Sequence, residues 1–314
     1  MKANKVSLNN EVLIDLTQDT AVEEDVLAGK TFHKADGSVG VGTATPSDKC
    51  IEGGLATVVL PSATKVKSYG FYHDAKLKKV SMPYVATIGD YAFEDCSSLS
   101  SVEFSEELTS IGANSFVRCT SLASLKLPDG LVSIGNACFG GCSALGLTKL
   151  PDRLTTLGSQ AFQSCTHLSL TELPNGLTKI NQYTFQYCSY LALTKLPNAI
   201  IEIGNYAFQT CGNMPLAELP ENLTTIGTDA FYQCGKLALT EIPSSVAKIY
   251  SRAFGNCAGL TSITFKGKPT SIANDTFNGC TNLTTINVPW TEGAVANAPW
   301  GATNATINYN YTEG

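Results

Sequence analysis

Cysteine and histidine are the residue types here that could bind a metal or form covalent links, and their spacing argues against both. The chain has eleven cysteines but only three histidines, His33, His73 and His167. No two cysteines follow the Cys-x-x-Cys spacing typical of zinc sites. We therefore expect no metal and no cofactor. His167 follows Cys165 by two residues and is expected to be a solvated turn residue.

Nine of the cysteines recur at one interval, each three residues after a phenylalanine. The step between successive pairs is 23 residues, and the phenylalanines are Phe93, Phe116, Phe139, Phe162, Phe185, Phe208, Phe231, Phe254 and Phe277. Coils that stack about 4.8 Å apart hold parallel Cβ atoms further apart than the ~3.8 Å usual for a disulfide. We expect reduced, buried thiols that fill a turn. Cys50 and Cys138 lie outside this series.

Catalytic patterns are missing from the sequence. There is no Gly-rich phosphate loop, nucleophile elbow or His-Glu-x-x-His motif. Acidic residues occur mainly as single members of repeated positions, such as the position ten residues after each phenylalanine. That position carries Glu103, Lys126, Lys149, Glu172, Lys195, Glu218, Glu241, Thr264 and Asn287. Mixed charges along one face indicate a solvated structural surface, so we expect that the protein is not an enzyme.

Tyrosine and glutamine offer recognition chemistry instead. Five tyrosines fall near the Phe and Cys positions of three consecutive repeats: Tyr183, Tyr187, Tyr190, Tyr206 and Tyr232. Gln186 and Gln209, together with Gln163, directly follow a phenylalanine. If this turn is exposed, these residues form a patch suited to a protein or glycan ligand. The alternatives are that the tyrosines only shield the turns, or that the contact surface is the face with Thr171, Glu172, Thr194 and Lys195.

The strict 23-residue period predicts that these residues are placed by a solenoid of stacked coils. Ile or Leu stands five residues before each phenylalanine and is usually followed by Gly. Leu or Met stands six residues after it, and another large apolar residue eleven after it. So short a repeat cannot bury its own apolar side, and neighbouring coils must share one core. An earlier, degenerate coil has Val66, Phe71 and Leu77, with Asp74 in place of Cys.

The pattern Ile-Gly-x-x-Ala-Phe-x-x-Cys resembles the BspA-like class of leucine-rich repeats over roughly residues 55 to 289. Proteins of this class occur at bacterial surfaces and in phages or prophages. The resemblance implies a right-handed leucine-rich-repeat superhelix, mainly β with short helical turns, of about ten 23-residue coils. Leu122, Leu125 and Leu127 also fit the Leu-x-x-Leu-x-Leu strand, although Gly130 replaces the Asn or Cys that usually follows.

Five middle coils change the apolar spacing of that strand. Leu122, Leu125 and Leu127 are followed in the next coil by Leu145, Leu147 and Leu150, and the shifted spacing continues to Leu237, Leu239 and Ile242. Because alternate strand residues face opposite sides, we expect a bulge or an altered strand boundary in these coils.

Two flanks complete the predicted organisation: residues 1–48 form a small N-terminal module or cap, 49–289 the solenoid, and 290–314 a C-terminal cap. We expect a helix over residues 21–28 and a hairpin around the Ala35–Ser38 turn. The segment Val26–Thr43 is similar to a module of phage and prophage tail-associated proteins. Trp290 and the Ala298–Gly301 segment supply apolar residues that can close the last coil.

The charge composition argues against two classes of binding partner. Charged residues make up 15%, the net charge is −6 and the pI is about 5.2, which argues against nucleic acid or an anionic membrane. No apolar run approaches the roughly 18 residues of a membrane span, and the N-terminus lacks the apolar segment of a signal peptide. We expect an extracellular, non-catalytic adhesion or recognition protein, on a bacterial surface or in a phage virion as a tail-associated receptor-binding component. The alternatives are a structural spacer with no ligand of its own, and a hydrolase of cell-wall glycan.

Overall fold

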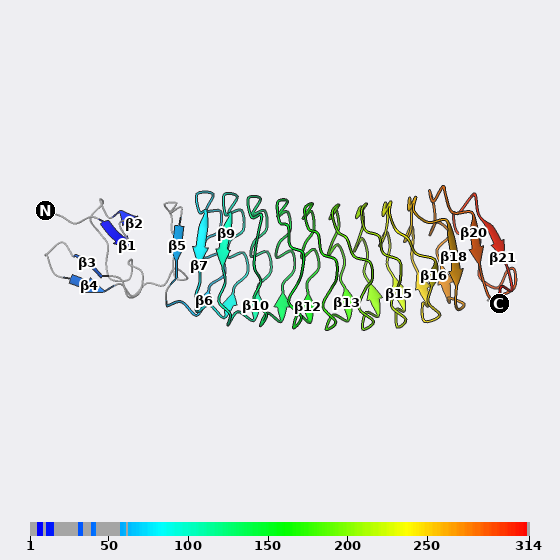
Figure 1. Ribbon diagram of the computed structural model, residues 1–314, viewed down its shortest axis with the longest axis horizontal. Coiled ribbons are helices and arrows are strands. Elements are labelled where there is room, and N and C mark those ends of the chain that lie inside the picture. The colour runs from blue at the N-terminus through cyan, green and yellow to red at the C-terminus, as the bar shows by residue number, and fades with distance from the viewer. Residues whose placement is uncertain are drawn as a thin grey trace.

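The computed structural model describes residues 57–60 and 62–312, together with the backbone of four short strands that precede them. Residues 62–312 form an elongated solenoid whose coils stack along one axis (Figure 1). Before it, β1 (Lys5–Leu8) pairs antiparallel with β2 (Glu11–Asp15), and β3 (Thr31–His33) pairs antiparallel with β4 (Val39–Val41). The second pair confirms the strands of the predicted hairpin. Its turn and the helix predicted over 21–28 lie outside the described residues.

Short parallel strands at the Ile position join the coils into two five-stranded sheets. The first holds β6 (Lys65–Val66), β8 (Thr87–Ile88), β10 (Ser110–Ile111), β11 (Ser133–Ile134) and β12 (Thr156–Leu157). The second holds β13 (Lys179–Ile180), β14 (Glu202–Ile203), β15 (Thr225–Ile226), β17 (Lys248–Ile249) and β19 (Ser271–Ile272). Equivalent residues of neighbouring coils pair, so each apolar residue points inward and is buried.

The strand predicted after the Cys turn forms only toward the two ends of the solenoid. One sheet contains β5 (Thr57–Val59), β7 (Lys79–Ser81) and β9 (Ser101–Glu103). The other contains β16 (Glu241–Ile242), β18 (Ser262–Phe265), β20 (Thr285–Asn287) and β21 (Thr306–Asn308).

Between those sheets, the described residues 122–219 have no strand at this position. The altered boundary expected in the middle coils is therefore present, but the strand predicted over Leu122–Leu127 is wrong. Nine residues after the ladder phenylalanine the end coils carry a buried residue such as Ile263, whereas most middle coils carry an exposed threonine such as Thr171 there and a buried leucine, Leu170, one residue earlier. Alternate residues of a strand face opposite sides, so this shift interrupts the alternation that a strand requires.

The predicted helical turns are also wrong, since residues 62–312 contain no helix. In most coils, the residues two before and two after the ladder phenylalanine have positive φ, for example 58° at Tyr183 and 63° at Tyr187. Left-handed residues interrupt the hydrogen bonds of a helix. The N–H groups of Tyr183, Phe185 and Tyr187 instead donate to carbonyls of the next coil at 2.9, 2.8 and 2.8 Å. The turn is thus held by its neighbour.

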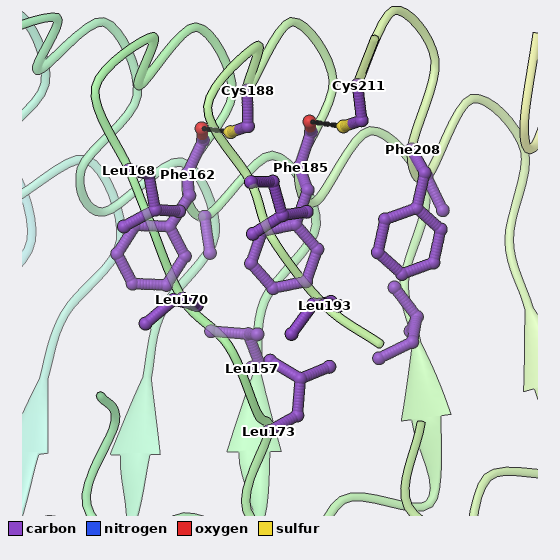
Figure 2. Packing of buried hydrophobic residues seen from close by; sticks show 14 of the residues in the cluster. Leu157, Phe162, Leu168, Leu170, Leu173, Phe185, Cys188, Leu193, Phe208 and Cys211 are labelled. Atoms are coloured by element: carbon purple, nitrogen blue, oxygen red, sulfur yellow. Dashed lines mark hydrogen bonds between the residues drawn. The ribbon is translucent and has the colours of Figure 1, made fainter. Parts of the chain in front are cut away.

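A ladder of stacked phenylalanine rings forms the core (Figure 2). Neighbouring ring centroids from Phe71 to Phe277 lie 5.0 to 5.9 Å apart, with the widest step between Phe162 and Phe185. Buried Phe71 confirms the degenerate first coil. Trp300, 23 residues after Phe277, is fully buried and accepts the Phe277 N–H at 2.9 Å. An eleventh turn therefore closes the C-terminal end, one more than predicted.

The cysteines form a second ladder beside the rings. The Cys188 thiol donates to the Phe162 carbonyl of the preceding coil at 3.1 Å, and Cys211 does the same to Phe185 at 3.0 Å (Figure 2). The Phe185 carbonyl also accepts the N–H of Cys188 at 3.1 Å, so two donors share this oxygen. All ten cysteines within the described residues are unlinked and buried, as expected. Cys50 lies outside them.

Candidate functional site

The residues predicted to bind a ligand lie in the turns around three successive ladder phenylalanines. We call Tyr183, Gln186, Tyr187, Tyr190, Tyr206, Gln209 and Tyr232 the tyrosine ridge. They occupy four positions of the coil: two residues before the phenylalanine, and one, two and five residues after it. Because the coils repeat in register, residues at the same position form columns along the solenoid axis.

The first column brings Tyr183 and Tyr206 together. Their rings are stacked with centroids 4.7 Å apart and planes 2° from parallel. Both residues have φ of 58°, a strained conformation for an aromatic residue. The bond from the Tyr183 N–H to the Asn205 carbonyl, at 2.9 Å, holds this conformation.

The second column is a ladder of glutamine amides. Gln163 Nε2 donates to Gln186 Oε1 at 2.5 Å, and Gln186 Nε2 donates to Gln209 Oε1. Gln186 is only 6% exposed, so little of this side chain is left for contact with a ligand. The ladder ties two turns of the ridge to each other and to the turn of Phe162, and it limits their independent movement.

Tyr187 and Tyr190 are the exposed members of the ridge. Tyr187 is 45% exposed and its ring contacts no other aromatic ring among the described residues. Tyr190 is 58% exposed, and its ring stacks on His167 at 5.5 Å. His167 is itself exposed and bonded through Nδ1 to the Ser143 carbonyl at 2.7 Å. It is a turn residue, as expected.

Tyr232 ends the ridge beside a charged cluster. Asn256 Nδ2 donates to the Tyr232 hydroxyl at 2.8 Å, and the Arg252 guanidinium carbon lies 5.4 Å from the ring centroid. Arg252 Nη2 also donates to Asp229 Oδ2 at 2.7 Å. This bond and the charge of Asp229 raise the pKa of Arg252. The cluster fixes the Tyr232 ring, and the positive charge of Arg252 is paired there with the buried Asp229 carboxylate.

Similarity to known proteins agrees with this architecture. The family described as BspA type leucine rich repeat region matches residues 64–192 and 178–297. The chain belongs to this family. No curated protein matches it.

Several solved structures are similar to this BspA-type chain. A leucine-rich repeat protein of T. pallidum is 26% identical, covering 63% of this chain and 91% of its own, with a TM-score of 0.49. The pneumococcal vaccine antigen PcpA is 19% identical, covering 99% and 100%, with a TM-score of 0.51. A leucine rich cell surface protein from Faecalibacterium prausnitzii A2-165 is 21% identical, covering 90% and 93%, with a TM-score of 0.45. At this identity, the likeness to PcpA shows the fold alone.

The BspA-type solenoid carries a second aromatic cluster that sequence reasoning missed. Tyr69 stacks on Tyr91 at 4.8 Å and meets Tyr72 edge-on at 5.4 Å, while Tyr72 lies 3.9 Å from His73. Tyr69 and Tyr91 hold the same position before the phenylalanine as Tyr183 and Tyr206, which is the signal that could have found them. The step from Phe71 to Phe93 is 22 residues, so the 23-residue period does not bring Tyr69 and Tyr91 to the same position.

Charged groups border this second cluster. Arg118 Nε donates to Asp95 Oδ1 at 2.5 Å, and Arg118 Nη2 donates to Glu94 Oε1 at 2.7 Å. The hydrogen bond from Arg118 lowers the pKa of Asp95. His73 Nε2 lies 3.2 Å from the other Asp95 oxygen.

The alternative contact face contains a shallow hollow. Glu172 and Lys195 line it together with the buried Leu173, and its volume is about 260 Å³. Thr171 and Thr194 are exposed next to it. Lys149 Nζ lies 4.0 Å from Glu172 Oε1, so the charges on this face are paired in part.

Two kinds of site receive no support from the described residues. Residues 62–312 and the strands before them contain no group of three His, Cys, Asp or Glu side chains placed to hold a metal ion. No helix within the same part of the chain has the length and hydropathy needed to cross a membrane.

Proposed function

We propose that this chain is a non-catalytic recognition protein that binds a protein or glycan through the tyrosine ridge. The exposed rings of Tyr187 and Tyr190 carry the proposal, because they stand on turns that inter-coil hydrogen bonds hold in place. Tyrosine buries a large area on binding and loses little side-chain entropy. A backbone that is already ordered reduces the remaining entropy cost of association.

The proposed location is the surface of a bacterium or a phage virion. One solved relative is called a vaccine antigen and another a leucine rich cell surface protein, which supports a bacterial surface. The phage alternative, as a tail-associated receptor-binding component, rests on the similarity of Val26–Thr43 to a tail-associated module.

A triple variant tests the ridge. Tyr187, Tyr190 and Tyr232 are changed to Ser, and binding to host cells and to purified wall glycan is measured. We expect at least a tenfold loss of affinity, about 1.4 kcal/mol. The matched control changes exposed tyrosines outside the ridge, Tyr84 and Tyr311, to Ser and should bind normally. Circular dichroism and thermal melts establish that both variants are folded.

The competing function is a spacer that positions another module. The glutamine ladder and the Tyr183–Tyr206 stack favour it, since these residues bond to one another as turn-shielding residues would. Unchanged binding in the triple variant would remove the ridge as a binding surface. Absence of binding by the unmodified chain to cells and to wall glycan would favour the spacer.

A further inference from the structure

The glycines of the repeat create a trough on the solenoid surface. The position four residues before the ladder phenylalanine is glycine in six coils, but Asn181, Tyr250 and Ala273 in three. A Cβ on Gly204 would lie 2.7 Å from the Gln182 nitrogen, and one on Gly227 would lie 2.6 Å from the Asn205 nitrogen. Glycine therefore allows neighbouring coils to approach closely. It also leaves the column without side chains there.

Asn181 and Tyr250 close this column on either side of Gly204 and Gly227. Together with residues of the adjacent columns they enclose a trough of about 580 Å³. Glu202 of β14 and Thr225 of β15 line one side. On the other side, Gln182, Asn205 and Thr228 line the trough from the column that follows the glycines.

Most of the polar groups that line the trough are neutral. Asn205 Oδ1 accepts the Thr228 N–H at 2.9 Å, and the Asn205 NH₂ group makes no hydrogen bond among the described residues. Lys179 Nζ lies 3.2 Å from Glu202 Oε2, so the one carboxylate that lines the trough already has a counter-charge. Hydroxyl and amide groups can both donate and accept hydrogen bonds. The site thus favours a ligand that is rich in hydroxyl groups and has no net charge.

Tyr250 supplies an aromatic wall. Its side chain is 44% exposed, and its N–H donates to the Ile226 carbonyl at 3.0 Å, which fixes the backbone beneath the ring. An aromatic face packs well against the C–H face of a pyranose ring, while the phenol hydroxyl remains available for a hydrogen bond. Ile203, the aliphatic lining residue, is fully buried. The trough therefore lacks the apolar pocket that an anchoring side chain of a protein partner requires.

We propose that the trough between Asn181 and Tyr250 is a binding site for a neutral saccharide. This inference rests on the proposed function only in that the solenoid is a recognition protein. It does not depend on the tyrosine ridge, because the trough is lined by different residues. A protein ligand is the competing occupant and becomes an outcome of the test.

The test uses the whole chain and a panel of neutral sugars at millimolar concentration: glucose, galactose, mannose, N-acetylglucosamine, cellobiose and diacetylchitobiose. Binding is followed by NMR through the amide signals of Gly204, Gly227 and Thr228. We expect at least one sugar to shift these signals in a saturable manner. No saturable shift with any member of the panel overturns the proposal, as does binding of random-sequence peptides at the trough without binding of sugar.

Variants locate the site. Tyr250→Ala and Thr228→Val should each weaken sugar binding, Tyr250→Ala by about tenfold. Tyr250→Phe keeps the ring and should bind nearly as well as the unmodified chain. Ala273 at the equivalent position shows that the fold accepts alanine there. If Tyr250→Ala does not fold, the other two variants test the proposal. Thr228→Val should still weaken sugar binding, and Tyr250→Phe should still retain it.

Controls separate this site from the ridge. Tyr84→Ala removes an exposed ring elsewhere and should leave sugar binding unchanged. The triple ridge variant should also bind sugar normally. Loss of sugar binding in the ridge variant with normal binding in Tyr250→Ala would overturn the trough and leave the ridge proposal standing. The reverse result would support the trough whether or not the ridge binds cells.

Discussion

At the residue scale, one carbonyl oxygen explains why phenylalanine and cysteine recur together. The Phe185 carbonyl accepts the Cys188 N–H of its own coil and the Cys211 thiol of the next. The Phe185 ring meanwhile lies between Phe162 and Phe208, at centroid distances of 5.9 and 5.5 Å. Each Phe-x-x-Cys unit thus contributes both ring packing and hydrogen bonds between neighbouring coils.

Removal of one ring should be costly. Phe185→Ala leaves a cavity between two rings in a fully buried column, and we expect a loss of about 3–5 kcal/mol in the free energy of unfolding. Tyr187→Ala, two residues away and exposed, should cost much less. Urea unfolding of both variants provides the measurement. A larger loss for Tyr187→Ala would contradict the assignment of the core.

The buried thiols should make the protein sensitive to alkali. Burial raises the pKa of Cys96 to about 12 and that of Cys280 to about 11, against about 8.5 for an exposed thiol. Above pH ~8.5 the unfolded chain loses thiol protons that the folded chain keeps. The thiol contribution to stability is thus complete below that pH and is lost as pH rises toward the folded pKa values.

Between the unfolded and folded pKa values, each ladder thiol should lower the free energy of unfolding by about 1.4 kcal/mol per pH unit. Cys188→Ser retains a donor to the Phe162 carbonyl and removes one ionisable group. The free energy of unfolding of this variant should therefore fall less steeply with pH between pH 8 and 11, because its unfolding releases one proton fewer.

A thiol titration without reductant should find few reactive groups in the native chain and all eleven after denaturation. Recovery of only a few would show a cross-linked ladder.

At the scale of elements, the sequence predicted the repeat, the core column and the buried thiols, because each depends on residues at a fixed period. The turns were mispredicted as helical because Tyr183 and Tyr187 carry no local signal for positive φ. Hydrogen bonds from their N–H groups to carbonyls of the next coil hold that conformation. The Leu-x-x-Leu-x-Leu pattern did not separate coils with this strand from coils without it, because Leu122–Leu127 fits the pattern and forms no strand.

The candidate surfaces were predictable only in part for the same reason. Sequence spacing placed Tyr183 and Tyr206 at one position, and the structure stacks them. It could not show that Gln186 is buried or that glycine columns leave a trough, because both depend on how closely adjacent coils approach.

Asn181 marks the break between the two sheets at the Ile position. Glycines in this column donate their N–H to the preceding coil, as Gly158 does to Ile134 at 2.9 Å. At Asn181, the side-chain Nδ2 donates to the Leu157 carbonyl instead, at 2.7 Å, and β12 does not pair with β13. Tyr250 and Ala273 keep the main-chain bond, so the loss of glycine alone does not explain the break.

Asn181→Gly should join the two sheets. Without the competing amide, the main-chain N–H of residue 181 can donate to Leu157. We expect its hydrogen exchange to slow by about fivefold, since a net hydrogen bond contributes about 1 kcal/mol. Ala273→Gly is the control and should change the exchange of its amide little, because that bond already exists. Unchanged exchange at residue 181 would show that another constraint separates the coils.

At the scale of the whole molecule, the coils stack in a line from Phe71 to Trp300 (Figure 1). Each coil of such a solenoid contacts mainly its two neighbours, so stability is close to a sum of coil and interface contributions. The widest ring separation and the break between sheets both fall between the coils of Phe162 and Phe185. This interface should therefore be the weakest within the array.

Local destabilisation should fade with distance along the array. Phe185→Ala is expected to accelerate amide exchange most in the coils of Phe162 and Phe208, and least in the coil of Phe71. Exchange followed by mass spectrometry, coil by coil, provides the measurement. Equal acceleration in all coils would mean that the solenoid unfolds as one cooperative unit and would contradict nearest-neighbour behaviour.

The shared phenylalanine carbonyl also gives the array a direction of growth. The thiol bonds to phenylalanine carbonyls all run from a later coil back to an earlier one, as from Cys188 to Phe162. During synthesis, the acceptor for each new cysteine has therefore already left the ribosome when that cysteine emerges. Each coil can therefore serve as the template for the next, while the hydrogen bonds that hold its own turn form only when that next coil is in place.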